Sequence, residues 1–321
     1  MSDDRMKMPP ERDFGFYQRR KHDKWRAVEA PVLAGAASAT GACVRVADTH
    51  AHVHMLPDPV WELARCAANG VDFVCEICDP SEDMFEPGAA VVEWRKGAEV
   101  HLWKAGLAAE PPTMRFATGV HPHNARLYDA EIEKLLLARL DDPACAALGE
   151  IGLDFHYDLS PRDVQRRVFL RQLAIAKDLG LPVALHLRGG DDPEADNAHR
   201  EAFHMLEKAG FPEAGTLLHC CALPPDELRP WIEAGCYVAY GGALTFKSSD
   251  AAREGALLVP LDRLLLETDA PYMTPEPMRG ATCTPAHVVF TAARLAELRG
   301  DEVLACTHEN ALRFLAWNAC L

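Results

Sequence analysis

Short apolar runs and longer amphipathic stretches alternate along the chain from Val44 onward. Each run ends in polar or histidine-rich residues, and a stretch with apolar residues at helical spacing follows. This alternation predicts strands and helices in turn, and strands that alternate with helices pair in parallel. The eight expected strands are Val44–His52, Val71–Asp79, Arg115–His123, Ala144–Asp154, Pro182–Arg188, Gly215–Cys221, Tyr237–Gly242 and Leu264–Pro271.

The stretch between the fourth and fifth runs shows why helices are expected between the strands. Ser160 is a suitable cap, Pro161 suits the first helical position, and Asp163 favours the positive start of a helix. Gly180 and Pro182 then end the helix. The apolar residues repeat at spacings of three and four and form one stripe. They are Val164, Val168, Phe169, Leu173, Ala176 and Leu179.

Eight strand–helix units in about 225 residues predict an α/β fold, a closed TIM-type (β/α)8 barrel. A doubly wound sheet is the alternative, but it needs a glycine-rich turn after its first strand, where this chain has His50-Ala51-His52. A length of 321 residues is near the size at which single cores stop growing. We expect residues 44–321 to form the barrel, and residues 1–43 to be an N-terminal extension that is partly helical or disordered.

The composition, with 49% apolar and 25% charged residues, is ordinary for a soluble globular protein. The net charge is −15, and it is −17 outside residues 1–30, which hold eight basic and six acidic side chains. Such an acidic chain does not favour binding of duplex nucleic acid through a broad basic face. It remains compatible with phosphate chemistry inside a pocket whose charge is set by bound metal ions.

The cysteines and the apolar stretches bear on the cellular compartment. The eleven cysteines are odd in number and irregularly spaced, which predicts reduced thiols and a cytoplasmic location. Cys75 and Cys78 form one CxxC pair, but no second pair completes a four-thiolate zinc site, so we expect small core residues. No apolar stretch reaches about 18 residues, so we expect no membrane span. No obligate protein partner is inferred.

Six residues of metal-ligand type lie at or near the ends of five expected strands, and the C-terminal ends of barrel strands converge on one mouth. A lone histidine is more often a core or surface residue than a ligand, but burying six such groups together is costly unless a cation satisfies them. Four ligands saturate one tetrahedral zinc, so six predict two divalent ions, either Mg, Mn or Zn. The six are His50, His52, Glu150, His186, His219 and Asp269.

Several ordered motifs resemble those of the TatD family of metal-dependent hydrolases, which are TIM-barrel phosphodiesterases. The motifs follow the family order and span about residues 44–317, and the ordered set is far more specific than an HxH alone. They are ADTHAHVH (47–54), GVHPH (119–123), GEIGLDFH (149–156), HLRG (186–189), HCCA (219–222) and LETDAPYMTPEPMRG (266–280).

The resemblance implies a role for each of the six ligands. His50 and His52 would hold the first ion together with Asp269, and Glu150 would bridge both ions. The second ion would be held by His186 and His219. Asp269 would also orient or deprotonate the attacking water, so Asp269 and Glu150 are the expected catalytic residues.

A second group is expected on the substrate side of the pocket, and the first four of its members alternatively support the ligands. Arg188 would offer a forked donor to a phosphate oxygen. The five expected substrate-binding residues are His121, His123, Asp154, Arg188 and Arg279.

The sequence departs from the family pattern at two places. An Asn typically follows the Arg-Gly pair after the TDAPY segment, whereas here Cys283 lies near that position. The 43-residue extension before the first strand is also unusual, and the sequence assigns it no role.

Three functions are compatible with this sequence. The first is a two-metal deoxyribonuclease or exonuclease that cleaves phosphodiester bonds of single-stranded or frayed DNA ends. The second is a hydrolase of a carboxylic ester or amide, such as an aminoacyl ester on tRNA, because an activated hydroxide attacks either centre. The third is a non-catalytic, metal-stabilised scaffold, which the complete ligand set disfavours.

Overall fold

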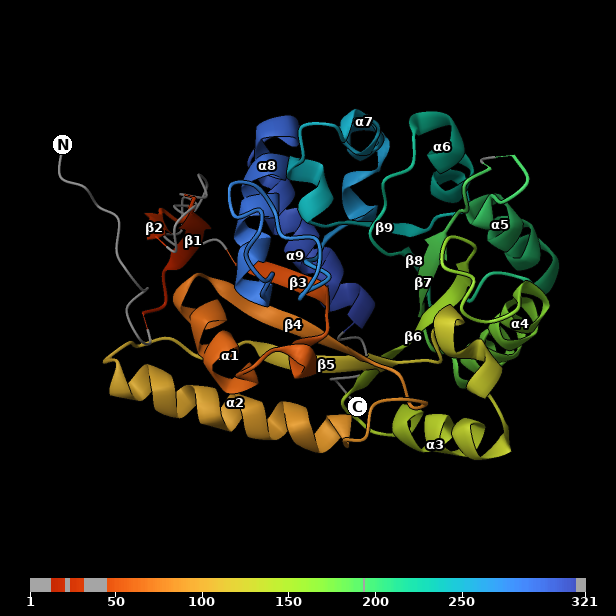
Figure 1. Cartoon of the computed structure of the whole chain (residues 1–321), viewed down its shortest axis with the longest axis horizontal. Helices are drawn as coiled ribbons and strands as arrows, with labels where there is room; N and C mark the ends of the chain where they lie inside the picture. The colour runs from red at the N-terminus through yellow and green to blue at the C-terminus, as the bar shows by residue number, and fades with distance from the viewer. Residues whose placement is uncertain (1–12, 21–23, 32–44, 193, 316–321) are drawn as a thin grey trace.

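A sheet of eight parallel strands lies at the centre of the molecule, with helices around it (Figure 1). The computed structural model describes residues 13–20, 24–31, 45–192 and 194–315. All eight strands expected from the sequence are present in this part of the chain. They are β3 (Val46–Ala51), β4 (Val71–Cys78), β5 (Thr113–Thr118), β6 (Cys145–Asp154), β7 (Val183–Arg188), β8 (Thr216–Leu218), β9 (Tyr237–Tyr240) and β10 (Leu264–Leu266).

The sheet curls into a barrel, in which each strand pairs with its neighbour in sequence, from β3 to β10. The two edges meet just beyond β10, where Ala51 and Ala270 form a parallel bridge. The amide of Asp269 donates to the carbonyl of His50 at 2.9 Å, and the amide of His52 donates to the carbonyl of Ala270 at 2.8 Å. The predicted TIM-type barrel is therefore confirmed, and its closure brings two of the expected ligand segments together.

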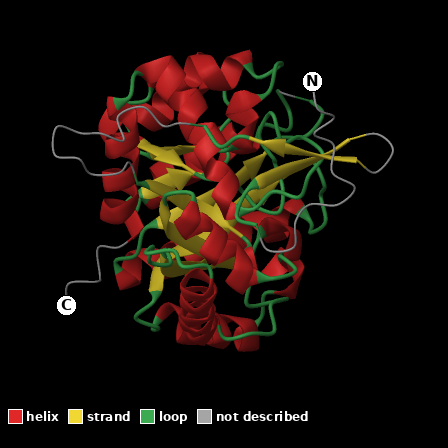
Figure 2. Ribbon diagram, turned by 90° about the vertical axis from the view of Figure 1, so that its left-hand side faces the viewer, coloured by secondary structure: helices red, strands yellow, loops and turns green. Residues whose placement is uncertain are grey.

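Helices surround the barrel, as Figure 2 shows. None in the described part of the chain is long and apolar enough to span a membrane. Short 3-10 segments lie between the longer elements: η1 (Val53–Met55), η2 (Pro122–Leu127), η3 (Gly242–Thr245), η4 (Leu261–Arg263) and η5 (Pro285–His287). The α-helices are α1 (Pro59–Ala68), α2 (Pro87–Lys104), α3 (Ala130–Leu140), α4 (Arg162–Leu179), α5 (Ala198–Ala209), α6 (Pro225–Glu233), α7 (Asp250–Leu258), α8 (Val288–Arg299) and α9 (Glu302–Leu315).

The helix expected after residue 160 is present as α4, with one difference at its start. Gly180 ends it in the left-handed conformation, at φ 65°. Pro161, rather than Ser160, occupies the N-cap position, and no side chain caps the helix. The hydroxyl of Ser160 instead donates to the carbonyl of His123 at 2.7 Å. Of the predicted stripe, Leu179 at the helix end is 51% exposed, whereas Val168, Phe169, Leu173 and Ala176 are buried.

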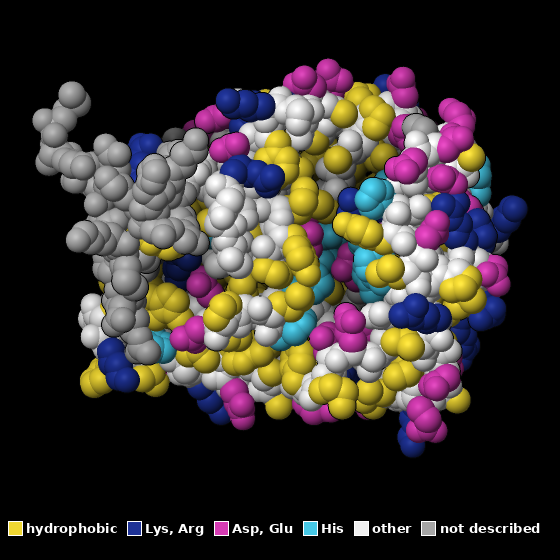
Figure 3. Space-filling model, in the orientation of Figure 1, with side chains coloured by type: hydrophobic (Ala, Val, Ile, Leu, Met, Phe, Trp, Pro, Cys, Tyr) yellow, Lys and Arg dark blue, Asp and Glu magenta, His cyan; other side chains and the backbone are white. Residues whose placement is uncertain are grey.

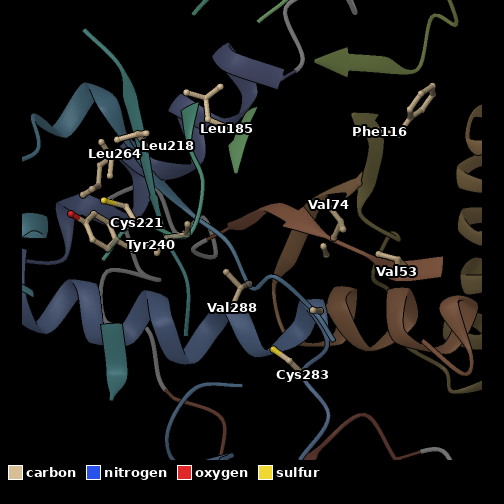
Figure 4. Packing of buried hydrophobic residues seen from close by; sticks show 14 of the residues in the cluster. Val53, Val74, Phe116, Leu185, Leu218, Cys221, Tyr240, Leu264, Cys283 and Val288 are labelled. Atoms are coloured by element: carbon tan, nitrogen blue, oxygen red, sulfur yellow. The ribbon is translucent and has the colours of Figure 1, made fainter. Parts of the chain in front are cut away.

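The buried apolar residues form two clusters, one of which lies largely between the sheet and the helices (Figure 4). Cys75 belongs to one cluster and Cys78 to the other. Residues three apart in a strand point to opposite faces, so this CxxC pair does not converge on a metal ion. Nine cysteines of the described residues are free thiols.

The described part of the N-terminal extension forms strands, which corrects the expectation of a helix or a disordered tail there. β1 (Phe16–Arg20) and β2 (Lys24–Val28) pair as an antiparallel hairpin. Phe16 is only 1% exposed, and its ring lies 4.8 Å from that of Phe290 on α8. The hairpin forms because Phe16 finds an apolar contact on the barrel, which the local sequence does not reveal. The rest of the extension lies outside the described residues.

Candidate metal centre

The six expected ligands come together at the C-terminal mouth of the barrel. They border or underlie a cavity of about 670 Å³. His50 lies beneath the cavity floor and is fully buried, whereas His52, Glu150, His186, His219 and Asp269 line it. In Figure 3, histidine and carboxylate side chains gather at a hollow near the middle of this face.

Glu150 divides the ligands into two groups, because its two carboxylate oxygens face different histidines. Oε2 lies 3.4 Å from Nε2 of His50 and 3.9 Å from Nε2 of His52. Oε1 lies 2.8 Å from Nδ1 of His186 and 3.5 Å from Nε2 of His219. Within each group the ligand atoms lie within 4.8 Å of one another. A carboxylate with this placement has the geometry to bridge two ions.

Asp269 completes the first group. Its Oδ1 lies 3.6 Å from Nε2 of His52 and 3.9 Å from Nε2 of both His50 and His219. The backbone of Asp269 has φ 58°, which a non-glycine residue adopts rarely and Asp tolerates better than most. The hydrogen bond from its amide to His50 holds this conformation, so closure of the barrel determines where the carboxylate points.

His50 provides the evidence that a cation fits among the nitrogen and oxygen atoms of these ligands. Both ring nitrogens of this buried residue have no hydrogen-bond partner. An unpaired buried imidazole is costly, and Nε2 faces the carboxylates of Glu150 and Asp269. Imidazole nitrogens and carboxylate oxygens suit zinc or manganese. The residues present therefore fit a divalent ion.

Two buried carboxylates lie behind the histidines of the second group. Oε2 of Glu267 accepts a hydrogen bond from Nδ1 of His219 at 3.0 Å, and Oδ2 of Asp154 lies 3.0 Å from Nε2 of His186. Both carboxylate residues are fully buried. Carboxylates in this position orient metal-ligating histidines and raise their basicity. Sequence analysis did not single out Glu267, although an acidic residue directly after the apolar run that forms β10 was a detectable signal.

The ligand histidines and carboxylates perturb one another strongly. Burial alone would raise the pKa of Glu150, but His50, His219 and His186 lower it well below its usual range. Burial would lower the pKa of His219, but Glu267 and Glu150 raise it to about 10. A ligand histidine must be neutral to coordinate a metal, so metal binding here displaces protons and weakens as the pH falls.

The five residues expected on the substrate side all line the cavity, but their environments differ. Asp154 is fully buried and bonded to His186 and to His123 (Nε2, 2.9 Å), which favours the supporting role over direct substrate contact. His121 lies with its ring 4.2 Å from that of His186. The guanidinium of Arg188 lies 4.8 Å from the ring centre of Tyr157, and that of Arg279 lies 4.0 Å from the ring centre of Phe246.

An acidic wall, which sequence analysis missed, follows β4 on the cavity surface. It consists of Asp79, Glu82 and Asp83. The amide of His121 donates to Oδ2 of Asp79 at 2.9 Å, so this wall fixes the predicted His121 segment. These acidic residues directly follow an apolar strand, which is the same kind of sequence signal as the one that identified the expected ligands.

Comparison with known proteins decides the family. The TatD related DNase family matches residues 47–316. The chain belongs to the TatD family of metal-dependent hydrolases. This confirms the resemblance seen in the sequence motifs.

Individual relatives extend this result. An uncharacterized metal-dependent hydrolase, YcfH of Escherichia coli, is 32% identical over 258 residues, which cover 78% of this chain and 93% of that protein. The 3'-5' ssDNA/RNA exonuclease TatD of Escherichia coli is 32% identical over 216 residues, which cover 65% of this chain and 80% of that protein. The structure of YJJV, a TatD homologue from Escherichia coli, has a TM-score of 0.71 at 25% identity and covers 85% of this chain and 98% of its own.

The two places where this chain departs from the TatD-family sequence pattern lie in different structural settings. Cys283, near the expected Asn position, is fully buried in the apolar cluster that also contains Val288 (Figure 4), and it does not border the cavity. It therefore offers no polar contact to a ligand there. The hairpin of the extension precedes the matched residues 47–316 and still packs on the barrel.

Proposed function

We propose that this TatD-family chain is a two-metal phosphodiesterase that removes nucleotides from single-stranded or frayed DNA ends. The observation that carries the proposal is the placement of the Glu150 carboxylate, whose two oxygens each face a separate pair of histidines. The relative described as a 3'-5' ssDNA/RNA exonuclease supports the substrate class. The free thiols of the described residues support a cytoplasmic location.

In this proposal the six ligands hold two divalent ions. His50, His52 and Asp269 would hold one, His186 and His219 would hold the other, and Glu150 would contact both. Bound at these residues, the ions would supply Lewis acids that activate water near neutral pH and neutralise charge on the attacked phosphate.

Asp269 acts on the attacking water in this proposal. Burial would raise the pKa of Asp269, but the contact with His52 and the nearby His219 and His50 lower it, so the carboxylate is ionised at neutral pH. An ionised carboxylate at the cavity surface can orient the water and accept its proton.

The cavity walls favour an unpaired nucleic acid end over a duplex. Arg188 and Arg279 provide guanidinium groups for phosphate oxygens. Tyr157 and Tyr272 line the same cavity, and each is 52% exposed. Arg188 lies over one face of the Tyr157 ring, and the exposed parts of both rings are available to stack on bases. Bases stack on such rings only when they are unpaired, which matches the acidic character of the chain outside the cavity.

The test uses protein that has been stripped of metal and reloaded with Mg, Mn or Zn. It is offered a chromogenic phosphodiester, single-stranded DNA labelled at either end, duplex DNA with blunt ends, and an aminoacyl-tRNA. We expect metal-dependent release of single nucleotides from the unlabelled 3' end of 5'-labelled single strands. Cleavage of the aminoacyl ester with untouched phosphodiesters would establish the ester hydrolase instead, and no turnover on any substrate would indicate a scaffold.

A further inference from the structure

The N-terminal hairpin contacts the loop that follows β10 at the mouth of the cavity. The carbonyl of Phe14 accepts a hydrogen bond from Nδ2 of Asn69 at 2.9 Å, and Phe16 lies 5.2 Å from the ring of His287 as well as against Phe290. The segment before β1 is therefore anchored on Asn69 just after α1, and β1 itself is anchored on the start of α8 and the residue before it.

Gln18 on β1 makes the direct connection to this loop. Its Nε2 donates to the carbonyl of Pro277 at 2.6 Å and lies 3.3 Å from the carbonyl of Arg279. Gln18 is only 8% exposed, so water does not readily replace these bonds. One amide group thus holds two backbone carbonyls that are separated by a single residue.

The loop carries side chains that form part of the cavity. Tyr272, Met273 and Arg279 all line it, although the loop contains neither helix nor strand. Arg279 is held by stacking on Phe246 and by a hydrogen bond of 3.1 Å from its Nη1 to the carbonyl of Thr274. The backbone of Arg279 itself therefore depends on Gln18, which comes from outside the family-matched residues.

We propose that Gln18 is a positioning residue, through which the N-terminal hairpin sets Arg279 at the cavity mouth to bind a phosphate of the substrate next to the scissile one. This inference rests on the phosphodiesterase function proposed above. It gives the extension a role in substrate specificity: a substrate with several phosphates gains affinity from Arg279, and a substrate with a single phosphate does not.

The hairpin offers an isosteric variant and a matched control. Gln18→Glu keeps the side-chain shape but replaces the donor with an oxygen that faces two carbonyls. Arg26 is the cross-strand partner of Gln18 and is exposed, so Arg26→Ala perturbs the same hairpin without touching the loop. Gln18→Ala removes the contact with less risk of a buried charge.

Kinetics in single and double variants give the first measurement. We expect Gln18→Glu and Gln18→Ala to raise KM for a short single-stranded oligonucleotide about fivefold, with kcat and the KM for a chromogenic phosphodiester unchanged. In an Arg279→Ala background the Gln18 substitutions should add nothing, because both act through the same group. Equal losses on both substrates, or additive effects with Arg279→Ala, would overturn the proposal.

Hydrogen exchange gives a second measurement that needs no activity. Both Gln18 variants should increase exchange of the amides of residues 276–281 and leave those of β6 and the metal content unchanged, and Arg26→Ala should change neither. Unchanged exchange in the loop would overturn the positioning role. Faster loop exchange in a protein that hydrolyses no phosphodiester would instead overturn the proposed function and leave the contact established.

Discussion

Glu267 accepts a hydrogen bond from Nδ1 of His219 at 3.0 Å, which leaves Nε2 of His219 facing Glu150 at 3.5 Å and Asp269 at 3.9 Å. When His219 is neutral, as metal binding requires, this bond favours the tautomer in which Nε2 carries the lone pair. A fully buried carboxylate in this place also makes the imidazole a better ligand. The properties of the proposed second ion would therefore depend on a residue outside the six expected ligands.

Glu267→Gln is expected to weaken metal binding at the second position about 10- to 100-fold, because the amide loses the charge that supports His219. Isothermal titration with Zn or Mn measures the affinity of each site. Glu233→Gln, at an exposed position on α6, is the control and should leave both affinities unchanged. Unaltered binding in Glu267→Gln would contradict the supporting role.

His186→Ala is expected to lower the metal content from two ions towards one. Its Nδ1 faces Oε1 of Glu150, whereas the group at Oε2 does not include it. Elemental analysis of the purified variant after reloading gives the stoichiometry. A variant that retains both ions would refute the assignment of His186 to a separate site.

Asp269→Asn is expected to lower kcat about 10³-fold while most of the metal stays bound. The amide keeps the size of the side chain and loses the negative charge that accepts a proton. Single-turnover cleavage and metal content, measured on the same preparation, separate the two effects. Activity at the wild-type level would remove Asp269 from its proposed role.

Tyr157→Ala is expected to raise KM for single-stranded DNA about tenfold, because one stacked base loses its partner. The KM for a chromogenic phosphodiester should change less than about twofold, since that substrate has no base to stack. Leu159→Ala is a control at an exposed apolar residue on the same segment. Similar losses on both substrates would indicate that Tyr157 acts on the metal centre rather than on bases.

The pH dependence of stability provides a prediction away from the metal centre. Burial, followed by the nearby Arg65, lowers the pKa of His287 from 6.5 to about 3. Below pH 6.5 the unfolded chain binds a proton that the native state does not, so the free energy of unfolding decreases by up to about 1.4 kcal/mol for each pH unit down to about pH 3. Above pH 6.5 the group contributes no pH dependence.

His287→Gln removes this titration. The free energy of unfolding of the wild type, relative to that of the variant, should therefore fall by about 2 kcal/mol between pH 7.5 and pH 5. Urea denaturation of metal-free protein at the two pH values measures it, because the metal ligands titrate alike in both proteins. A difference between the proteins that is the same at both pH values would disprove the perturbed pKa.

Much of the barrel could be predicted because its signals are local. The apolar runs mark all eight strands, and Gly180 ends α4 where expected. The prediction that Ser160 caps this helix was wrong, since its hydroxyl donates to the carbonyl of His123, 37 residues away. The hairpin was missed for a similar reason, because the apolar contact that stabilises it lies on α8 at the other end of the chain.

In the candidate site, too, some residues could be predicted from the sequence and others could not. His50, His52, Glu150, His186, His219 and Asp269 could be named from the sequence, because ligand-type residues at strand ends must meet at one end of a parallel barrel. Glu267 and Asp79 escaped notice, although Glu267 is fully buried and Asp79 is nearly so. Their importance lies in which histidine or amide they contact, and such pairings depend on distances between separate strands.

The sequence by itself determined the order of strands and helices, the kinds of ligand and the family, because periodicity and motif spacing are properties of short segments. Only the tertiary structure decided how the ligands are shared, with Oε2 of Glu150 facing one pair of histidines and Oε1 the other. It also decided that Gln18 supports the loop of Arg279, 261 residues further along. These relationships arise when the barrel closes and the hairpin packs on it, since only packing brings groups so distant in sequence within hydrogen-bond reach.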